Sequence, residues 1–252
     1  MSCPAIHVGA PQAMSLLHEP FDAAVFDMDG TLLDTESVFR AIVFEVVGEL
    51  GFEMTDHVHG RMVGSSHEAT EKLLIEAYGV SFPYADFDRH CRDRMVNHTR
   101  DSAIPVKHGA RELLGALKAN HIPIAVATSS RGPHARSHLG AAGLLDLFDV
   151  VVTRDDVVRP KPHPEPYLLA ADRLGADPTR CLAFEDSHAG VRAAHAAGMR
   201  TIMVPDLVAP TDEVARLCIA VLESLAHAHE GLPESFAVAN ASDNHLHLKT
   251  TG

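Results

Sequence analysis

Cysteine is scarce in this chain of 252 residues, and its four cysteines form no metal or redox pattern. Cys3, Cys91, Cys181 and Cys218 are widely spaced, with no Cys-x-x-Cys pair and no histidine placed with them as in a metal site. We therefore expect a reduced protein of the cytoplasm.

Long apolar segments are also missing. No stretch approaches the roughly 18 apolar residues that a membrane-spanning helix requires. The segment before Glu19 has neither the basic start nor the continuous apolar run of a secretory signal. These absences predict a soluble protein without a membrane partner.

Positive charge is in deficit, with 21 Lys and Arg residues against 34 Asp and Glu residues and a formal net charge of -13. Nucleic acid and anionic membrane surfaces would be repelled by such a chain. A phosphorylated small molecule would be repelled as well, so a site for one must contain its own cation.

What the chain does have is a regular alternation of helices and short apolar strands after Gly109. Together with an early apolar segment, this pattern predicts strands over 23–26, 123–128, 148–152, 181–184 and 201–204, and a closing helix over 211–228. Strands alternating with helices are typical of a parallel sheet covered on both faces. We expect a three-layer α/β/α, Rossmann-like fold.

The region 37–102 interrupts this pattern, because its apolar residues recur at helical spacing and strand signals are weak. It is predicted to be an inserted all-helical cap. The expected organisation is an N-terminal extension over 1–19, a core domain over 20–36 and 103–231, the cap over 37–102, and a flexible polar tail over 232–252.

Two carboxylates, Asp27 and Asp29, lie two positions apart where the first strand ends. Carboxylates this close remain ionised together only if a cation lies between them, and otherwise one of them keeps its proton. Either arrangement suits acid–base or metal-assisted chemistry. Taken alone, Asp29-Gly30 is also an ordinary turn signal.

Three further polar segments follow predicted strands or loops of the core: Thr128-Ser129-Ser130, Lys161 between prolines, and Glu185-Asp186. Each has a plain structural explanation, as a helix cap, a solvated loop lysine or an acidic helix start. Because ligands collect at the carboxyl ends of parallel strands, the segments are expected to meet at one rim. Hydroxyls, one cation and hard oxygen ligands together predict a phosphate and metal site.

The order of these four motifs, with a helical insertion directly after the first, resembles the haloacid dehalogenase superfamily over about residues 22–205. It is similar to the helical-cap branch that contains beta-phosphoglucomutase and pseudouridine 5'-phosphatase. The resemblance implies a HAD-like fold and a Mg²⁺-dependent phosphatase that acts on a small sugar- or nucleoside-type phosphate through an aspartyl phosphate.

The resemblance also implies roles for individual residues. Asp27 would be the nucleophile, and Asp29 the general acid and then the general base. Thr128, Ser129 and Lys161 would bind the phosphate. Mg²⁺ would be held by the Asp27 carboxylate, the Asp29 backbone carbonyl and Asp186, with Glu185 as a direct or outer-shell partner.

Two alternatives stay open beside the phosphatase. A hexose-phosphate mutase similar to beta-phosphoglucomutase would need a His and an Arg at places that hold Phe39 and His67 here, and these two residues, with Arg61, are the candidates for substrate selectivity in the cap. A phospho-accepting receiver domain is the remote alternative, since receivers are about half this length. The expected partner is a small phosphorylated metabolite, for a monomer or small homo-oligomer.

Overall fold

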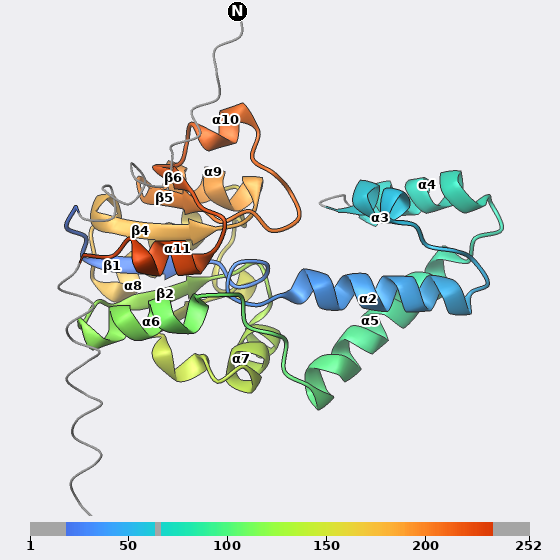
Figure 1. The fold of residues 1–252 in the computed structure, drawn as a ribbon, viewed down its shortest axis with the longest axis horizontal. Coiled ribbons are helices and arrows are strands. Elements are labelled where there is room, and N and C mark those ends of the chain that lie inside the picture. Colours follow the sequence, from blue (N-terminus) through green and yellow to red (C-terminus); the bar gives the residue numbers. More distant parts are fainter. Residues whose placement is uncertain (1–18, 64–66, 234–252) are drawn as a thin grey trace, which may run out of the picture. The chain divides into compact units, whose positions relative to one another are not determined.

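The computed structural model describes residues 19–63 and 67–233, and the chain divides into two compact units (Figure 1). Among the described residues, the first unit comprises 19–33 and 106–233, and the second lies between Asp34 and Pro105. The expected N-terminal extension and C-terminal tail lie almost wholly outside the described residues.

The first unit is built on a parallel sheet of six strands in the order β3-β2-β1-β4-β5-β6. The strands are β1 (Ala23–Phe26), β2 (Ile124–Ala127), β3 (Val150–Val152), β4 (Cys181–Glu185), β5 (Arg200–Met203) and β6 (Ala220–Val221). Every residue of β1, β2 and β4 is buried, as expected for central strands covered on both faces. The predicted α/β fold and its first five strands are confirmed.

Helices cover both faces of this sheet. They are α6 (Ala110–Ala119), α7 (Gly132–Ala141), α8 (Glu165–Leu174), α9 (His188–Ala196), α10 (Asp212–Ala215) and α11 (Leu225–Glu230), with short 3₁₀ turns at Leu145–Leu147, Arg154–Asp156 and Pro178–Arg180. Figure 1 shows α6 and α11 in front of the sheet and α8 behind it. Alanines dominate the core beneath α8 and α9, so these helices lie close to the strands.

The helix predicted over 211–228 is wrong. That segment holds the short helix α10, the edge strand β6 and the start of α11. Ile219 and Leu222 donate backbone hydrogen bonds to Thr201 and Met203, at 2.8 Å each, and so extend the sheet beside β5. Pairing with an available sheet edge decided the conformation of a short apolar run that periodicity alone cannot assign.

In its described residues, 34–63 and 67–105, the second unit has helices and no strand, as predicted, and it is called the helical unit below. It contains α2 (Thr35–Glu49), α3 (Asp56–Met62), α4 (His67–Tyr78) and α5 (Tyr84–Asp101), packed around a core of their own. Asp34 caps α2, because its side chain accepts a hydrogen bond from the Ser37 N–H at 3.3 Å. The two ends of the unit are paired, since the Asp34 N–H donates to the Pro105 carbonyl at 2.8 Å.

No helix within residues 19–63 and 67–233 has both the length and the apolar character needed to cross a membrane.

Candidate active site

The loop after β1 turns sharply, and it places Asp27 and Asp29 at the carboxyl edge of the sheet. Leu32 and Leu33 both donate backbone hydrogen bonds to the Met28 carbonyl, at 2.9 and 3.0 Å. Gly30 has a φ of +83°, and a Cβ there would lie 2.4 Å from Asp186 Oδ2. Only glycine satisfies both the backbone angle and the close approach of the Asp186 carboxylate.

Lys161 joins two of the acidic residues. Its ammonium donates to Asp27 Oδ1 and to Glu185 Oε1, the latter at 2.5 Å, and all three side chains are more than nine-tenths buried. Burial alone would lower the pKa of Lys161, but the carboxylates of Asp27 and Glu185 raise it above its usual value. The lysine is therefore a fixed positive charge inside the site.

Both carboxylate oxygens of Glu185 accept hydrogen bonds. Its Oε1 accepts from Lys161 and from the Tyr167 hydroxyl at 2.7 Å, and its Oε2 accepts from the backbone N–H groups of Asp186 and Ser187 and from the Ser187 hydroxyl. Gly190 leaves room for this carboxylate, since a Cβ there would lie 1.7 Å from Oε1. Glu185 therefore accepts hydrogen bonds both from Lys161 and from the residues that precede α9, and so it links the two.

Asp29 has different neighbours, because hydroxyl groups surround it. Its Oδ2 accepts a hydrogen bond from Ser130 Oγ at 2.7 Å and a long one from Thr128 Oγ1 at 3.4 Å. Thr128 Oγ1 in turn accepts from the Ser130 N–H at 2.9 Å. The loop after β2 therefore holds the Asp29 carboxylate in a set orientation.

Three carboxylates could share a metal ion, since oxygens of Asp27, Glu185 and Asp186 all lie within 4.8 Å of one another. Burial raises the pKa values of Asp27 and Asp186, and the neighbouring carboxylates raise them further. One ammonium does not balance three carboxylates, so the site favours a divalent cation. Carboxylate oxygens are the ligands that Mg²⁺ prefers, and the residues present therefore fit this ion.

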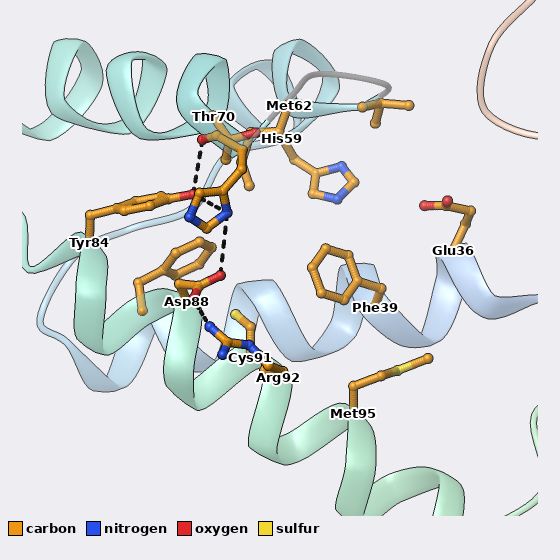
Figure 2. Close-up of a pocket in the computed structure, with 13 residues that line it drawn as sticks. Glu36, Phe39, His59, Met62, Thr70, Tyr84, Asp88, Cys91, Arg92 and Met95 are labelled. Carbon is orange, nitrogen blue, oxygen red and sulfur yellow. Dashed lines mark hydrogen bonds and ion pairs between the residues drawn. The ribbon is translucent and has the colours of Figure 1, made fainter. Parts of the chain in front are cut away.

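The structure brings together six of the residues singled out in the sequence, namely Asp27, Asp29, Thr128, Lys161, Glu185 and Asp186. Ser129 is exposed, and it is its neighbour Ser130 that contacts Asp29. Phe39 and His67 line a pocket within the helical unit (Figure 2), whereas Arg61 is not among the residues that line it and donates to Glu76 at 3.0 Å.

Two contributors to the site were given no role in the sequence analysis, Thr31 and Tyr167, and Ser130 was singled out there only as part of the segment Thr128-Ser129-Ser130. Thr31 Oγ1 donates to Asp186 Oδ1 at 3.0 Å. Tyr167 lies at the start of α8 among apolar residues, where its pattern indicates only a core position. Burial and the Glu185 carboxylate raise the pKa of Tyr167 well above its usual value, so its hydroxyl remains a donor.

Replacing Tyr167 with phenylalanine should lower kcat/KM without unfolding the protein. The substitution removes the hydrogen bond to Glu185 Oε1 and keeps the ring that packs 5.1 Å from Lys161 Nζ. Losing a buried hydrogen bond to a charged group costs about 1.5–3 kcal/mol, so we expect about 10- to 100-fold lower kcat/KM if the bond orients Lys161. Steady-state kinetics and a melting curve of the variant check this expectation. Tyr78→Phe in the helical unit is the matched control. Unchanged kinetics with a lower melting temperature would show that Tyr167 has a purely structural role.

Comparison with known proteins agrees with this geometry. The family model described as haloacid dehalogenase-like hydrolase matches residues 24–204. The chain is 35% identical over 190 residues to the fructose-1-phosphate phosphatase YqaB of Escherichia coli (strain K12), a match that covers 75% of this chain and 98% of that protein.

Two further relatives extend the comparison. The chain is 33% identical over 181 residues to a phosphorylated carbohydrates phosphatase of Thermotoga maritima, covering 72% of this chain and 83% of that protein. It is also similar to the crystal structure of a haloacid dehalogenase family hydrolase from Deinococcus radiodurans R1 with bound phosphate and sodium. That likeness has a TM-score of 0.74 and 29% identity, and covers 88% of this chain and 97% of the other.

Proposed function

Because this chain belongs to the haloacid dehalogenase-like hydrolases, we propose that it hydrolyses a small phosphate monoester of sugar or nucleoside type through a phosphoaspartate formed on Asp27. Relatives named as sugar phosphatases support the reaction class. The observation that carries the mechanism is the unequal environment of two neighbouring acids: Asp27 contacts the Lys161 ammonium, whereas Asp29 contacts hydroxyl groups.

In the first half of the reaction, a carboxylate oxygen of Asp27 attacks the phosphorus atom. The ester P–O bond breaks, and Asp29 gives its proton to the leaving alkoxide, which departs as the alcohol. Lys161 and Thr128 would bind the phosphoryl oxygens, since they offer a buried ammonium and a buried hydroxyl at the same rim.

In the second half, Asp29 is ionised and accepts a proton from a water molecule. That water attacks the phosphorus of the phosphoaspartate and the P–O bond to Asp27 breaks. Inorganic phosphate then leaves, with Asp27 again a carboxylate and Asp29 again a protonated carboxyl group for another cycle. Asp29 thereby serves once as acid and once as base, and its hydrogen bonds from Ser130 and Thr128 keep it facing the reacting atoms.

Mg²⁺ is the cofactor we propose, held by the Asp27 carboxylate, the Asp29 backbone carbonyl and Asp186. When bound, the ion supplies charge neutralisation for the phosphate and for the crowded carboxylates. Glu185 is proposed as an outer partner, because both of its oxygens already accept hydrogen bonds from Lys161, Tyr167 and the start of α9.

The proposal is tested with several dozen phosphate esters, assayed with and without Mg²⁺ for free phosphate and, by ³¹P NMR, for isomerised ester. We expect Mg²⁺-dependent release of phosphate. Formation of a sugar 6-phosphate from a sugar 1-phosphate, with little free phosphate, would instead establish the mutase. The apolar Phe39 favours the phosphatase, because the resemblance places a histidine there in the mutase.

Replacing Asp29 with asparagine should reduce turnover of alkyl phosphates by about 10²- to 10⁴-fold, the usual contribution of a general acid or base. Asparagine keeps the acceptor for Ser130 but cannot transfer a proton. The leaving group of p-nitrophenyl phosphate needs little protonation. With this ester the variant should still transfer the phosphoryl group to Asp27, but it should hydrolyse the phosphoaspartate very slowly. Rapid-quench kinetics should therefore show a burst of nitrophenol; equal loss for both ester types, with no burst, would contradict the double role of Asp29.

A further inference from the structure

A pocket of about 470 Å³ lies within the helical unit, between side chains of α2, α3, α4 and α5 (Figure 2). Its volume falls within the range of about 300–1,000 Å³ that is typical of small-molecule sites. Much of its wall is apolar or aromatic: Phe39, Met62, Val63, Tyr84, Phe87 and Met95. Such a lining favours a flat, largely apolar ligand over a polyhydroxylated one.

The polar groups along one side of the pocket are already paired with one another. Asp88 accepts from Arg92 and lies 3.6 Å from His67 Nδ1, and the Tyr84 hydroxyl donates to the His67 carbonyl at 3.1 Å. Sugar hydroxyls need several hydrogen-bonding partners that are not already paired. The polar groups of these residues are already hydrogen-bonded or ion-paired within the protein.

His59 is different. The residue as a whole is 8% exposed, its side chain makes no hydrogen bond with the described residues, and its ring nitrogens are not sealed from solvent. The ring packs against Phe44, with 5.8 Å between centroids, and Figure 2 shows the imidazole projecting from α3 toward the middle of the pocket. Burial and the nearby Arg40 lower the pKa of His59, so at neutral pH one ring nitrogen donates and the other accepts.

We propose that this pocket binds a planar heteroaromatic ring, of the nucleobase class, whose polar edge exchanges a hydrogen bond with His59 and whose faces pack against Phe39 and Tyr84. A ligand of this kind would pair with the imidazole, whose nitrogens are open to the pocket, and would fill the aromatic space around it. The ring could come from the alcohol part of the phosphate ester, in which case the inference rests on the proposed function, or from a separate free ligand.

The test is calorimetric titration of the full chain with adenosine, uridine and, for contrast, glucose. The variants are His59→Leu, Phe39→Ala, the rescue variant His59→Gln, and His57→Leu as a control, since His57 is exposed on the same helix and does not line the pocket. We expect saturable nucleoside binding that weakens at least about tenfold in His59→Leu and Phe39→Ala and is partly restored in His59→Gln. His57→Leu should bind like the unmodified chain, and melting curves should confirm that every variant is folded.

The absence of saturable binding by either nucleoside, or binding that His59→Leu leaves unchanged, would overturn the proposal. A kinetic comparison distinguishes the two sources of the ring, the phosphate ester itself and a separate ligand. It compares kcat/KM for adenosine and uridine 5'-monophosphates with kcat/KM for glucose 6-phosphate. If kcat/KM is higher for the nucleotides and His59→Leu removes this difference, the ring belongs to the ester that is hydrolysed. If nucleosides bind but kcat/KM shows no such preference, the ring belongs to a separate ligand. Failure to hydrolyse any ester would count against the phosphatase and leave the binding result standing.

Discussion

Replacing Asp27 with asparagine is expected to abolish phosphate release, with a loss of at least about 10⁴-fold in kcat, as for removal of other catalytic nucleophiles. Asparagine has the shape of aspartate and keeps an oxygen that can accept from Lys161, so the buried contact is preserved. Its amide oxygen carries no full negative charge and cannot form a stable bond to phosphorus. The variant should fold and should fail at the first chemical step.

Two measurements make this result decisive. Mass spectrometry of acid-quenched reactions should show one added phosphoryl group on the unmodified enzyme and none on Asp27→Asn. Asp22→Asn is the matched control, because Asp22 is half-exposed beside the same strand and pairs with Arg180 at the surface. Its activity should be near that of the unmodified enzyme. Normal turnover by Asp27→Asn would remove the covalent mechanism.

Removing divalent metal with a chelator is expected to abolish activity and also to make the protein less stable as the pH rises. Burial raises the pKa of Asp27 from 3.8 to about 7, and that of Asp186 from 3.8 to about 9. A carboxyl group whose pKa is raised by folding binds more protons in the folded state, so its contribution to stability falls as the pH rises through this window. The metal-free chain should therefore lose stability between about pH 4 and about pH 9.

Mg²⁺ should reverse this loss, and its effect should be larger at about pH 8 than at about pH 5, because protons compete with the metal for the same oxygens. At a concentration about 100 times its Kd, the ion would add about 2.7 kcal/mol, which corresponds to a rise of roughly 5–10 °C in Tm for a chain of this size. The readout is the difference in Tm with and without Mg²⁺ at each pH, because the 18 histidines also titrate and would obscure the raw values.

The matched variant for this experiment is Asp186→Asn, which removes one carboxylate of the cluster and should shrink the Mg²⁺-induced rise in Tm at the higher pH. Glu213→Gln, an exposed acidic change on α10, should leave the rise intact. A Tm that does not respond to Mg²⁺ at either pH would refute the metal site.

Much of the fold could be predicted from the sequence because its signals are local. Short apolar strands between helices predict a parallel sheet, and the rule that its ligands gather at the carboxyl ends brings Asp27, Thr128 and Asp186 together without any knowledge of contacts. The all-helical character of Asp34–Pro105 follows from periodicity in the same way.

The features of the fold and site that could not be predicted depend on contacts between distant parts of the chain. Tyr167 is part of the site because its hydroxyl reaches Glu185, 18 residues away, and an apolar helix start gives no sign of this. Ser130, rather than Ser129, contacts Asp29 because of the path of the loop after β2, which a run of hydroxyl residues does not reveal. Strand β6 exists because β5 offers a free edge, and that edge is a property of the assembled sheet.

The pairing of Asp34 with Pro105 has a consequence for how this architecture can diversify. Because the chain leaves and re-enters the sheet unit at neighbouring positions, everything between them can be lengthened, shortened or exchanged without stretching a strand. A recombination event at this junction would exchange one complete helical unit for another while leaving the residues at the carboxyl edge of the sheet unchanged.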